Sequence, residues 1–260
     1  MSSSVRHGKI PVWYDKDCKL EEMYNDNTAD SRTTNSSIEK ILKKHKIKTV
    51  LDLTCGTGSQ VFYLAKRGYQ VTGSDISRGM LKIAKQKMSK EKTNVKLLRG
   101  DMRTIKVGKF DTALTIFNSV GHLTKTGFKK TIRNIHRNLN DGGIYVFDIL
   151  NLNYAMHDDN ITKFSLERVK TIENTKFREI QHSIIDHQGI LISYTTHYSQ
   201  KGSSKLSTTK TTITLQLYTA KELREILSSN GFKVLGQYAI DGSKFSDKKT
   251  ERILTAARKV

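Results

Sequence analysis

The stretch VLDLTCGTGS, residues 50–59, constrains the fold more than any other part of the sequence. Its apolar first residues predict a short buried strand, and Gly56 and Gly58 predict a tight turn directly after it. The segment SQVFYLAKRG that follows has helical character and a closing glycine, Gly68. A glycine turn between a strand and a helix brings the backbone very close to a ligand. The sequence therefore predicts a ligand site at this turn.

Strand and helix patterns alternate along the first 150 or so residues. A helix from Asn35 or Ser36 to about His45 precedes the first strand, and Ser77 is placed to cap another. A third helix has apolar residues at helical spacing, with basic residues between them: Phe128, Ile132, Ile135 and Leu139. The strand-like runs are QVTGSD, NVKLLRGD, FDTALTIFN and IYVFDIL. This alternation predicts an α/β protein with a doubly wound parallel sheet.

The alternation breaks between about residues 160 and 218, where strand-like runs follow one another without helices. Apolar residues alternate along 190–198 and again along 213–217, and QKGSSK forms a turn between these runs. An antiparallel β insertion is expected here. Thr219 is then placed to cap the helix AKELREILSSNG, and the strands FKVLGQYAI and RILTAARKV complete the parent pattern.

The residues around the glycine turn distinguish between two kinds of ligand. A dinucleotide-binding turn, G-x-G-x-x-G, requires a third small residue, but this sequence has Val61 at that position. The carboxylate of Asp52, just before the turn, would gain nothing beside a pyrophosphate. S-adenosylmethionine carries an ammonium and a sulfonium and no phosphate, so an acidic strand end and an open glycine turn suit it.

At these positions the sequence resembles class I S-adenosylmethionine-dependent methyltransferases. VLDLTCGTGS is similar to their first motif, D-x-x-C-G-x-G; VTGSDIS is similar to the second, and RGDMR to the adenine-contacting turn. The resemblance implies a Rossmann-like, mostly parallel seven-stranded sheet, with the antiparallel insertion before the last helix. It also implies that Asp75 holds the ribose hydroxyls. The implied cofactor-binding residues are Arg32, Asp52, Thr54, Gly56, Gly58, Asp75, Ile76, Met80, Asp101, Met102 and Ile116. Met80 covers the adenine or belongs to the core.

Two further stretches resemble small-molecule enzymes of this family. IFNSVGHL is similar to N-S-x-x-H-L segments of glycine and amino-sugar N-methyltransferases, and YNDNTADSRT is similar to a segment of the glycine enzymes. The second similarity implies that Arg32 grips the methionine carboxylate, unless it is an exposed loop residue. The single proline, Pro11, excludes the N-P-P-Y motif of methyltransferases that act on amino groups of DNA bases. The stretch FDILNLNYA lacks the arginine with which glycine enzymes bind their substrate, so glycine itself is not expected.

The expected reaction is methyl transfer to a small-molecule acceptor, with an amine nitrogen favoured. His122 is the candidate general base or hydrogen-bond partner, because the pKa of histidine lies near the working pH; alternatively it only packs there. Tyr14 and Tyr24 either point hydroxyls at the methyl group, close a lid, or lie on the surface. Cys55 is expected to be a packing residue.

The predicted organisation has three parts. Residues 1–34 form an N-terminal lid segment that orders on cofactor binding. Residues 35–155 and 219–260 form the Rossmann-like cofactor-binding domain. Residues 156–218 form the insertion.

The net charge of +20 leaves a second function open, methylation of tRNA or rRNA. Many of the lysines fall on the solvated faces of predicted helices, and no aromatic base-stacking motif is present, so the small molecule is preferred. Cys18 and Cys55 make neither a disulfide framework nor a metal cluster, and no metal site is expected. With no apolar run of membrane-spanning length and no signal-peptide pattern, a reducing cytoplasm is the expected location.

Overall fold

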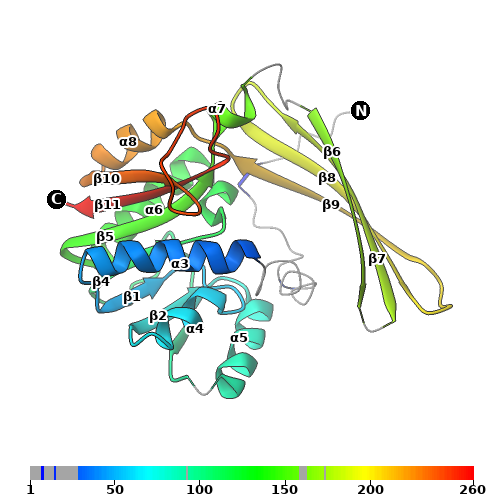
Figure 1. Ribbon diagram of the computed structural model, residues 1–260, viewed down its shortest axis with the longest axis horizontal. Helices are drawn as coiled ribbons and strands as arrows, with labels where there is room; N and C mark the ends of the chain where they lie inside the picture. The colour runs from blue at the N-terminus through cyan, green and yellow to red at the C-terminus, as the bar shows by residue number, and fades with distance from the viewer. Residues whose placement is uncertain (1–6, 9–14, 16–28, 92, 158–162, 173) are drawn as a thin grey trace.

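The computed structural model describes residues 7–8, 15, 29–91, 93–157, 163–172 and 174–260. These residues form two separate sheets, one of seven strands and one of four. Figure 1 shows helices on both faces of the seven-stranded sheet, while the four-stranded sheet projects to one side of it. No helix in the described part of the chain is long and apolar enough to cross a membrane.

The seven-stranded sheet has the order β10-β11-β5-β4-β1-β2-β3, which confirms the predicted fold class. Its parallel part pairs β1 with β2 and β4, β2 with β3, and β4 with β5, while β11 runs antiparallel between β5 and β10. The strands are β1 (Thr49–Asp52), β2 (Gln70–Asp75), β3 (Lys96–Arg99), β4 (Phe110–Thr115), β5 (Leu139–Leu150), β10 (Phe232–Ala239) and β11 (Arg252–Lys259). β5 begins before the predicted Ile144, because Leu139 already pairs with Phe110 across a register shift.

The five predicted helices are present, α3 begins earlier than predicted, and two short helices, α7 and η1, were not predicted. They are α3 (Ala29–Lys44), α4 (Ser59–Ala65), α5 (Arg78–Lys90), α6 (Lys125–Asn138), α7 (Leu152–Ala155) and α8 (Ala220–Ser228), with a short 3₁₀ helix, η1 (Ser119–His122). The predicted caps form: the Ser77 hydroxyl accepts the Met80 N–H, and Thr219 forms a capping box with Glu222.

The predicted start of α3 at Asn35 or Ser36 was wrong, because the helix begins at Ala29. The residues that it adds bury a polar face: Ser31 and Thr34 are 1% and 0% exposed, and Asn35 continues this face at 4%. A search for apolar residues at helical spacing cannot find a helix whose first buried positions are polar. The end of the predicted lid segment is therefore helical.

Two apolar clusters pack on the opposite faces of the seven-stranded sheet. One contains the four apolar residues that the sequence placed on the third predicted helix, all 0% exposed: Phe128, Ile132 and Ile135 lie on α6, whereas Leu139 is the first residue of β5 and not helical as predicted. The other packs α3, α4 and α5 on the sheet, with Ile38, Leu42, Val61 and Leu81 in it. Helices on both faces bury the parallel strands, whose carboxyl ends meet at one edge.

The four-stranded sheet confirms the antiparallel insertion. Its strands are β6 (Lys163–Ile172), β7 (Thr175–Ile185), β8 (Ile190–Lys201) and β9 (Ser207–Gln216), paired in sequence order. On β8 the apolar alternation lies on the more open face, with Tyr194 45% exposed. The opposite face is the buried one and includes small polar residues, Ser193 and Thr195.

Candidate active site

The glycine turn after β1 is built by backbone geometry that favours glycine. Gly56 and Gly58 have φ of 52° and 94°, in the left-handed region. A Cβ atom on Gly58 would lie 2.3 Å from the ring of Phe62 in α4. The Thr54 hydroxyl then accepts the N–H of Ile116 at 3.2 Å, which ties this turn to the end of β4.

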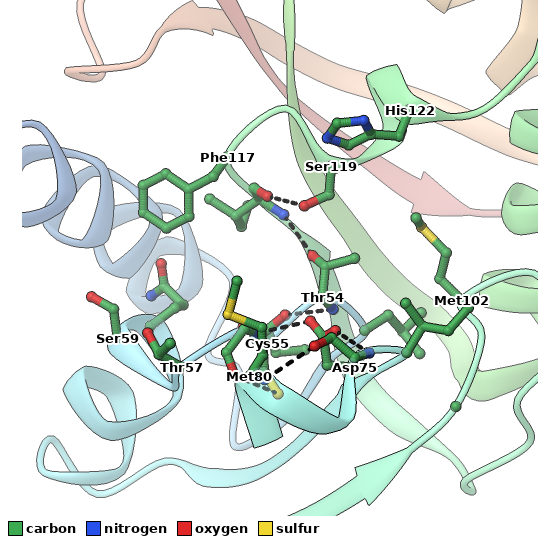
Figure 2. A pocket seen from close by; sticks show the side chains of 18 of the residues that line it. Thr54, Cys55, Thr57, Ser59, Asp75, Met80, Met102, Phe117, Ser119 and His122 are labelled. Carbon is green, nitrogen blue, oxygen red and sulfur yellow. Dashed lines mark hydrogen bonds between the residues drawn. The ribbon is translucent and has the colours of Figure 1, made fainter. Parts of the chain in front are cut away.

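A cavity opens at the carboxyl ends of β1, β2 and β4, where ligands bind in open α/β sheets. It brings together nine of the predicted cofactor-binding residues and His122, several of them labelled in Figure 2: Asp52, Thr54, Gly56, Asp75, Ile76, Met80, Asp101, Met102 and Ile116. Gly58 does not line it, and its role is the turn itself. Their binding roles stay predictions.

Besides Gly58, two predicted catalytic residues and a second predicted cofactor residue are not placed in this cavity. Tyr14 and Tyr24 lie outside the described residues. Arg32 is exposed on α3 and is not among the lining residues.

Sequence reasoning missed other lining residues, which stand beside the predicted ones. They are Leu53, Cys55, Thr57, Ser59, Gln60, Ser77, Gly100, Phe117 and Ser119. Most lie within the motifs quoted above, so their position was available, but nothing in the sequence says which side chains turn inward.

Asp75 is held by backbone donors at the end of β2. Its carboxylate accepts the N–H of Gly56 and the N–H of Ser77, each at 2.9 Å. Burial raises the pKa of Asp75, although these hydrogen bonds oppose the shift. The donors fix the carboxylate in the wall of the cavity, where its remaining lone pairs can accept from ligand hydroxyls.

Asp52 is a second, more deeply buried carboxyl group. It is 2% exposed and accepts the Thr54 N–H at 3.0 Å. Burial raises the pKa of Asp52 to about 7, and the charge of Asp75 acts in the same direction. Among the described lining residues none is a lysine or an arginine, whereas three are aspartates: Asp52, Asp75 and Asp101. The cavity therefore favours a cationic ligand.

The third carboxylate, Asp101, is already engaged. The Nε of Arg103 lies 2.9 Å from its Oδ1 and 3.0 Å from its Oδ2. Burial raises the pKa of Asp101, but the hydrogen bonds and charge of Arg103 outweigh it and leave the pKa below its usual value. The next carbonyl, of Met102, accepts from Asn134 in α6 at 3.0 Å, so this turn is held from both sides.

On the opposite side of the cavity the chain makes a strained turn after β4. Phe117 and Asn118 both have φ in the left-handed region, 59° and 56°, which is uncommon for residues other than glycine. The Asn118 N–H donates to Asp148 at 3.0 Å, and its side-chain oxygen accepts the Leu150 N–H at 3.1 Å. Asp148 is 0% exposed and also accepts from the Nε of Arg252 at 2.9 Å. This network holds the turn that presents Phe117 and Ser119 to the cavity.

His122 ends η1 and lines the same side of the cavity. Burial, with a smaller effect from His7, lowers the pKa of His122 to about 4. The expectation of a pKa near the working pH was therefore wrong, because the ring is desolvated in the cavity wall. His7 bridges this region to the insertion, with its ring nitrogens 2.9 Å from the Leu123 carbonyl and 3.0 Å from the Thr214 hydroxyl.

Cys55 contributes volume to the cavity floor. It is 6% exposed, and burial raises the pKa of its thiol well above the usual value. A Cβ atom on Gly73, in the neighbouring strand β2, would lie 3.1 Å from the Cys55 Sγ and 3.0 Å from Leu97. The unreactive thiol agrees with the predicted packing role.

The fold defined by this sheet and site is that of Rossmann-like methyltransferases. An S-adenosylmethionine-dependent methyltransferase from Clostridium acetobutylicum superposes with a TM-score of 0.78 at 17% identity, covering 94% of this chain and 98% of that one. DesVI from Streptomyces venezuelae gives a TM-score of 0.74 at 17% identity, with 93% and 98% covered.

The sequence matches are shorter than the structural ones. Residues 50–143 match the family described as a methyltransferase domain. Human glycine N-methyltransferase is 29% identical over 133 residues, 45% of each chain. The dTDP-3-amino-3,4,6-trideoxy-α-D-glucopyranose N,N-dimethyltransferase of Streptomyces venezuelae is 29% identical over 102 residues, 38% of this chain and 41% of that one. The matches span 41% and 58% of the length of two further relatives, from Bacillus subtilis and a Geobacillus species. Together these findings confirm the resemblance to class I S-adenosylmethionine-dependent methyltransferases.

Proposed function

We propose that this chain is an S-adenosylmethionine-dependent methyltransferase whose acceptor is a small molecule, with an amine nitrogen as the receiving atom. The observation that carries the proposal is the cavity at the glycine turn, which has three aspartates and no lysine or arginine among its described lining residues. Such a lining suits a cationic cofactor without phosphate. The site residues fit this cofactor. Backbone donors beside the turn hold the carboxylate oxygens of Asp75 in a fixed position in the cavity wall.

The residues would hold the cofactor along the cavity. Asp75 would bind the ribose hydroxyls, while Ile76, Met80 and the turn at Asp101 would enclose the adenine. Asp52 would face the positive charge. The cofactor supplies a methyl group activated by its sulfonium, so the protein has to position the nucleophile, which in model reactions contributes roughly 7–11 kcal/mol.

His122 fits the acceptor side of this reaction. An amine must be neutral to attack, and a neutral imidazole can accept a hydrogen bond from its N–H. The lowered pKa keeps His122 neutral at pH 7, so that its first task would be to orient the amine. Phe117 and Ser119 would form the neighbouring wall.

The relatives support an amine acceptor, since they are named as N-methyltransferases of glycine and of an amino sugar. Glycine is not proposed, because no arginine occurs in residues 147–155.

Methyl transfer from labelled S-adenosylmethionine to a panel of small amines, without RNA, tests the proposal. We expect His122→Ala to lower the rate by about 10²–10⁴ if the ring acts as a general base, and less if it only orients the amine. With a pKa of about 4, His122 should contribute no titration between pH 6 and 9 in the rate profile. If the protein binds S-adenosylmethionine but transfers its methyl group to none of the amines, the hypothesis of an amine acceptor is rejected.

One observation favours RNA as a second candidate acceptor. A surface groove between α5 and β3 is lined by Arg78, Lys82, Lys85 and Arg99 together with Leu81, Gln86 and Ser89. Binding of RNA alone would not decide, because a chain at +20 attracts polyanions at low salt. Methyl groups appearing only on tRNA or rRNA, at about 0.15 M salt, would replace the small-molecule proposal.

A further inference from the structure

Gln60, in the first turn of α4, is a buried polar side chain without a hydrogen-bond partner among the described residues. It is 2% exposed and lines the cavity. Neither its Oε1 nor its Nε2 makes a hydrogen bond to any residue that the structure describes. A buried amide left unsatisfied costs about 1–3 kcal/mol, and few such groups persist in folded proteins. This one therefore needs an explanation, and it stands at the wall of the proposed cofactor site.

The position of Gln60 identifies which part of the cofactor it would meet. It follows Thr57 and Ser59 in the chain, and all three line the cavity. Figure 2 shows Thr57 and Ser59 on the side of the cavity away from Met102, with Asp75 between the two sides. If the adenine lies at Asp101 and Met102 and the ribose at Asp75, the amino-acid end must extend toward α4.

Arg32, to which the family resemblance assigned this contact, is placed differently. It is exposed on α3 and does not line the cavity. The buried face of α3 carries Ser31, Thr34 and Asn35 in its place. Within the described ranges, the Thr34 hydroxyl and the Asn35 Oδ1 are also buried without a hydrogen-bond partner. The inward residues at the start of this helix, up to Asn35, are therefore neutral and polar.

We propose that the side-chain amide of Gln60 binds the amino-acid end of the cofactor, and that this neutral group replaces the arginine. The amide can serve both charges of that end, since its NH₂ donates to a carboxylate and its oxygen accepts from an ammonium. The assignment rests on the proposed function. It explains why an amide is kept in the cavity wall without a partner in the described part of the protein.

The test compares two ligands that differ in the amino-acid end. S-adenosylhomocysteine has it, and 5′-methylthioadenosine lacks it. We expect Gln60→Leu to weaken S-adenosylhomocysteine binding by about 10- to 100-fold, as for hydrogen bonds to charged groups, and to leave 5′-methylthioadenosine within about twofold. Arg32→Ala, the matched control, should leave both within about threefold. Calorimetric titration measures all six affinities.

Stability separates a binding role from a structural one. Gln60→Leu removes an unpaired amide at similar shape, so its unfolding temperature should equal or exceed that of the native protein. A side chain kept for packing would lower it.

Equal weakening of both ligands by Gln60→Leu would overturn the assignment, and so would selective loss of S-adenosylhomocysteine in Arg32→Ala. Failure of the native protein to bind either ligand would instead overturn the proposed function, on which the assignment rests.

Discussion

The two sheets of this protein are held together in different ways. In the seven-stranded sheet, residues 144–149 of β5 are at most 2% exposed, and helices cover both faces. In the four-stranded sheet, the edge strand β6 is mostly exposed, and Val169 and Tyr194 expose 56% and 45% of their surface. None of the described cavity-lining residues comes from the four-stranded sheet. The comparison indicates that the cavity belongs to the buried sheet and not to the described residues of the insertion.

The largest expected effect is on stability. It comes from breaking the buried ion pair of the seven-stranded sheet, and an exposed pair in the four-stranded sheet serves as the comparison. Arg252→Ala leaves the carboxylate of Asp148, 0% exposed, without its guanidinium partner. We expect the free energy of unfolding to fall by about 3–5 kcal/mol, because an unpaired buried charge is costly. Arg178→Ala breaks an exposed pair with Glu167, 2.8 Å apart, and should cost less than about 1 kcal/mol. Urea unfolding measures both.

A double variant controls for this first prediction. Asp148→Asn with Arg252→Gln removes both charges, so it should recover part of the lost stability. Equal losses for Arg252→Ala and Arg178→Ala would contradict the distinction between the sheets.

The next effect concerns cofactor affinity. Asp75→Ala should weaken S-adenosylmethionine binding by about 1.5–3 kcal/mol, or roughly 10- to 150-fold, through loss of charge-assisted hydrogen bonds. Glu167→Ala removes a carboxylate of the insertion and should leave the affinity unchanged. Calorimetric titration measures the cofactor affinity of both variants. An unchanged affinity in Asp75→Ala would show that Asp75 does not bind the ribose hydroxyls.

A smaller effect follows from the buried carboxyl of Asp52. Its pKa of about 7 means that it is largely protonated below pH 7, and a cationic cofactor favours the ionised form. The cofactor affinity should therefore rise with pH by up to about tenfold per unit below pH 7 and level off above it, with a proton released on binding. Calorimetry in buffers of different ionisation enthalpy detects the proton. Asp52→Asn should flatten the profile, and a flat profile in the native protein would refute the coupling.

In the absence of cofactor, the same carboxyl group should make the stability of the folded protein fall as pH rises, whereas the cofactor affinity rises. The pKa of Asp52 is raised from the usual 3.8 of an aspartate to about 7, so the folded state binds more protons between these two pH values. Its contribution to stability is therefore favourable at low pH and is lost as pH rises through about 7. Bound cofactor should remove that loss.

The smallest expected effects come from single tyrosines. Tyr145→Phe in β5 removes a hydroxyl that lies 2.6 Å from the Thr115 hydroxyl in a fully buried position, and should cost about 1 kcal/mol. Tyr194→Ser in β8 should stay within about 0.5 kcal/mol, since its side chain is half-exposed. Thermal unfolding compares them, and a larger loss for Tyr194→Ser would show that the open face of the insertion is covered in solution.

What could be predicted from the sequence was local. The strand β2, the glycine turn and the caps at Ser77 and Thr219 lie within short segments, so neighbouring residues specify them. The contact of Asp148 with Arg252 joins positions 104 apart, and no local pattern encodes it. The pKa of His122 likewise depends on burial by distant segments. The start of α3 was missed because its inward residues are polar.

The contact between β2 and the glycine turn has a consequence for related sequences. Gly73 pairs with Asp52, and any side chain on it would meet Cys55 and Leu97 at 3.0–3.1 Å. The two positions share one volume, so they should not change independently during evolution. Homologues with alanine or serine at position 73 should carry a smaller residue at 55, and glycine at 73 should accompany cysteine or a larger residue there. Covariation of this kind would reveal the packing of the cavity floor in proteins whose structures are not known.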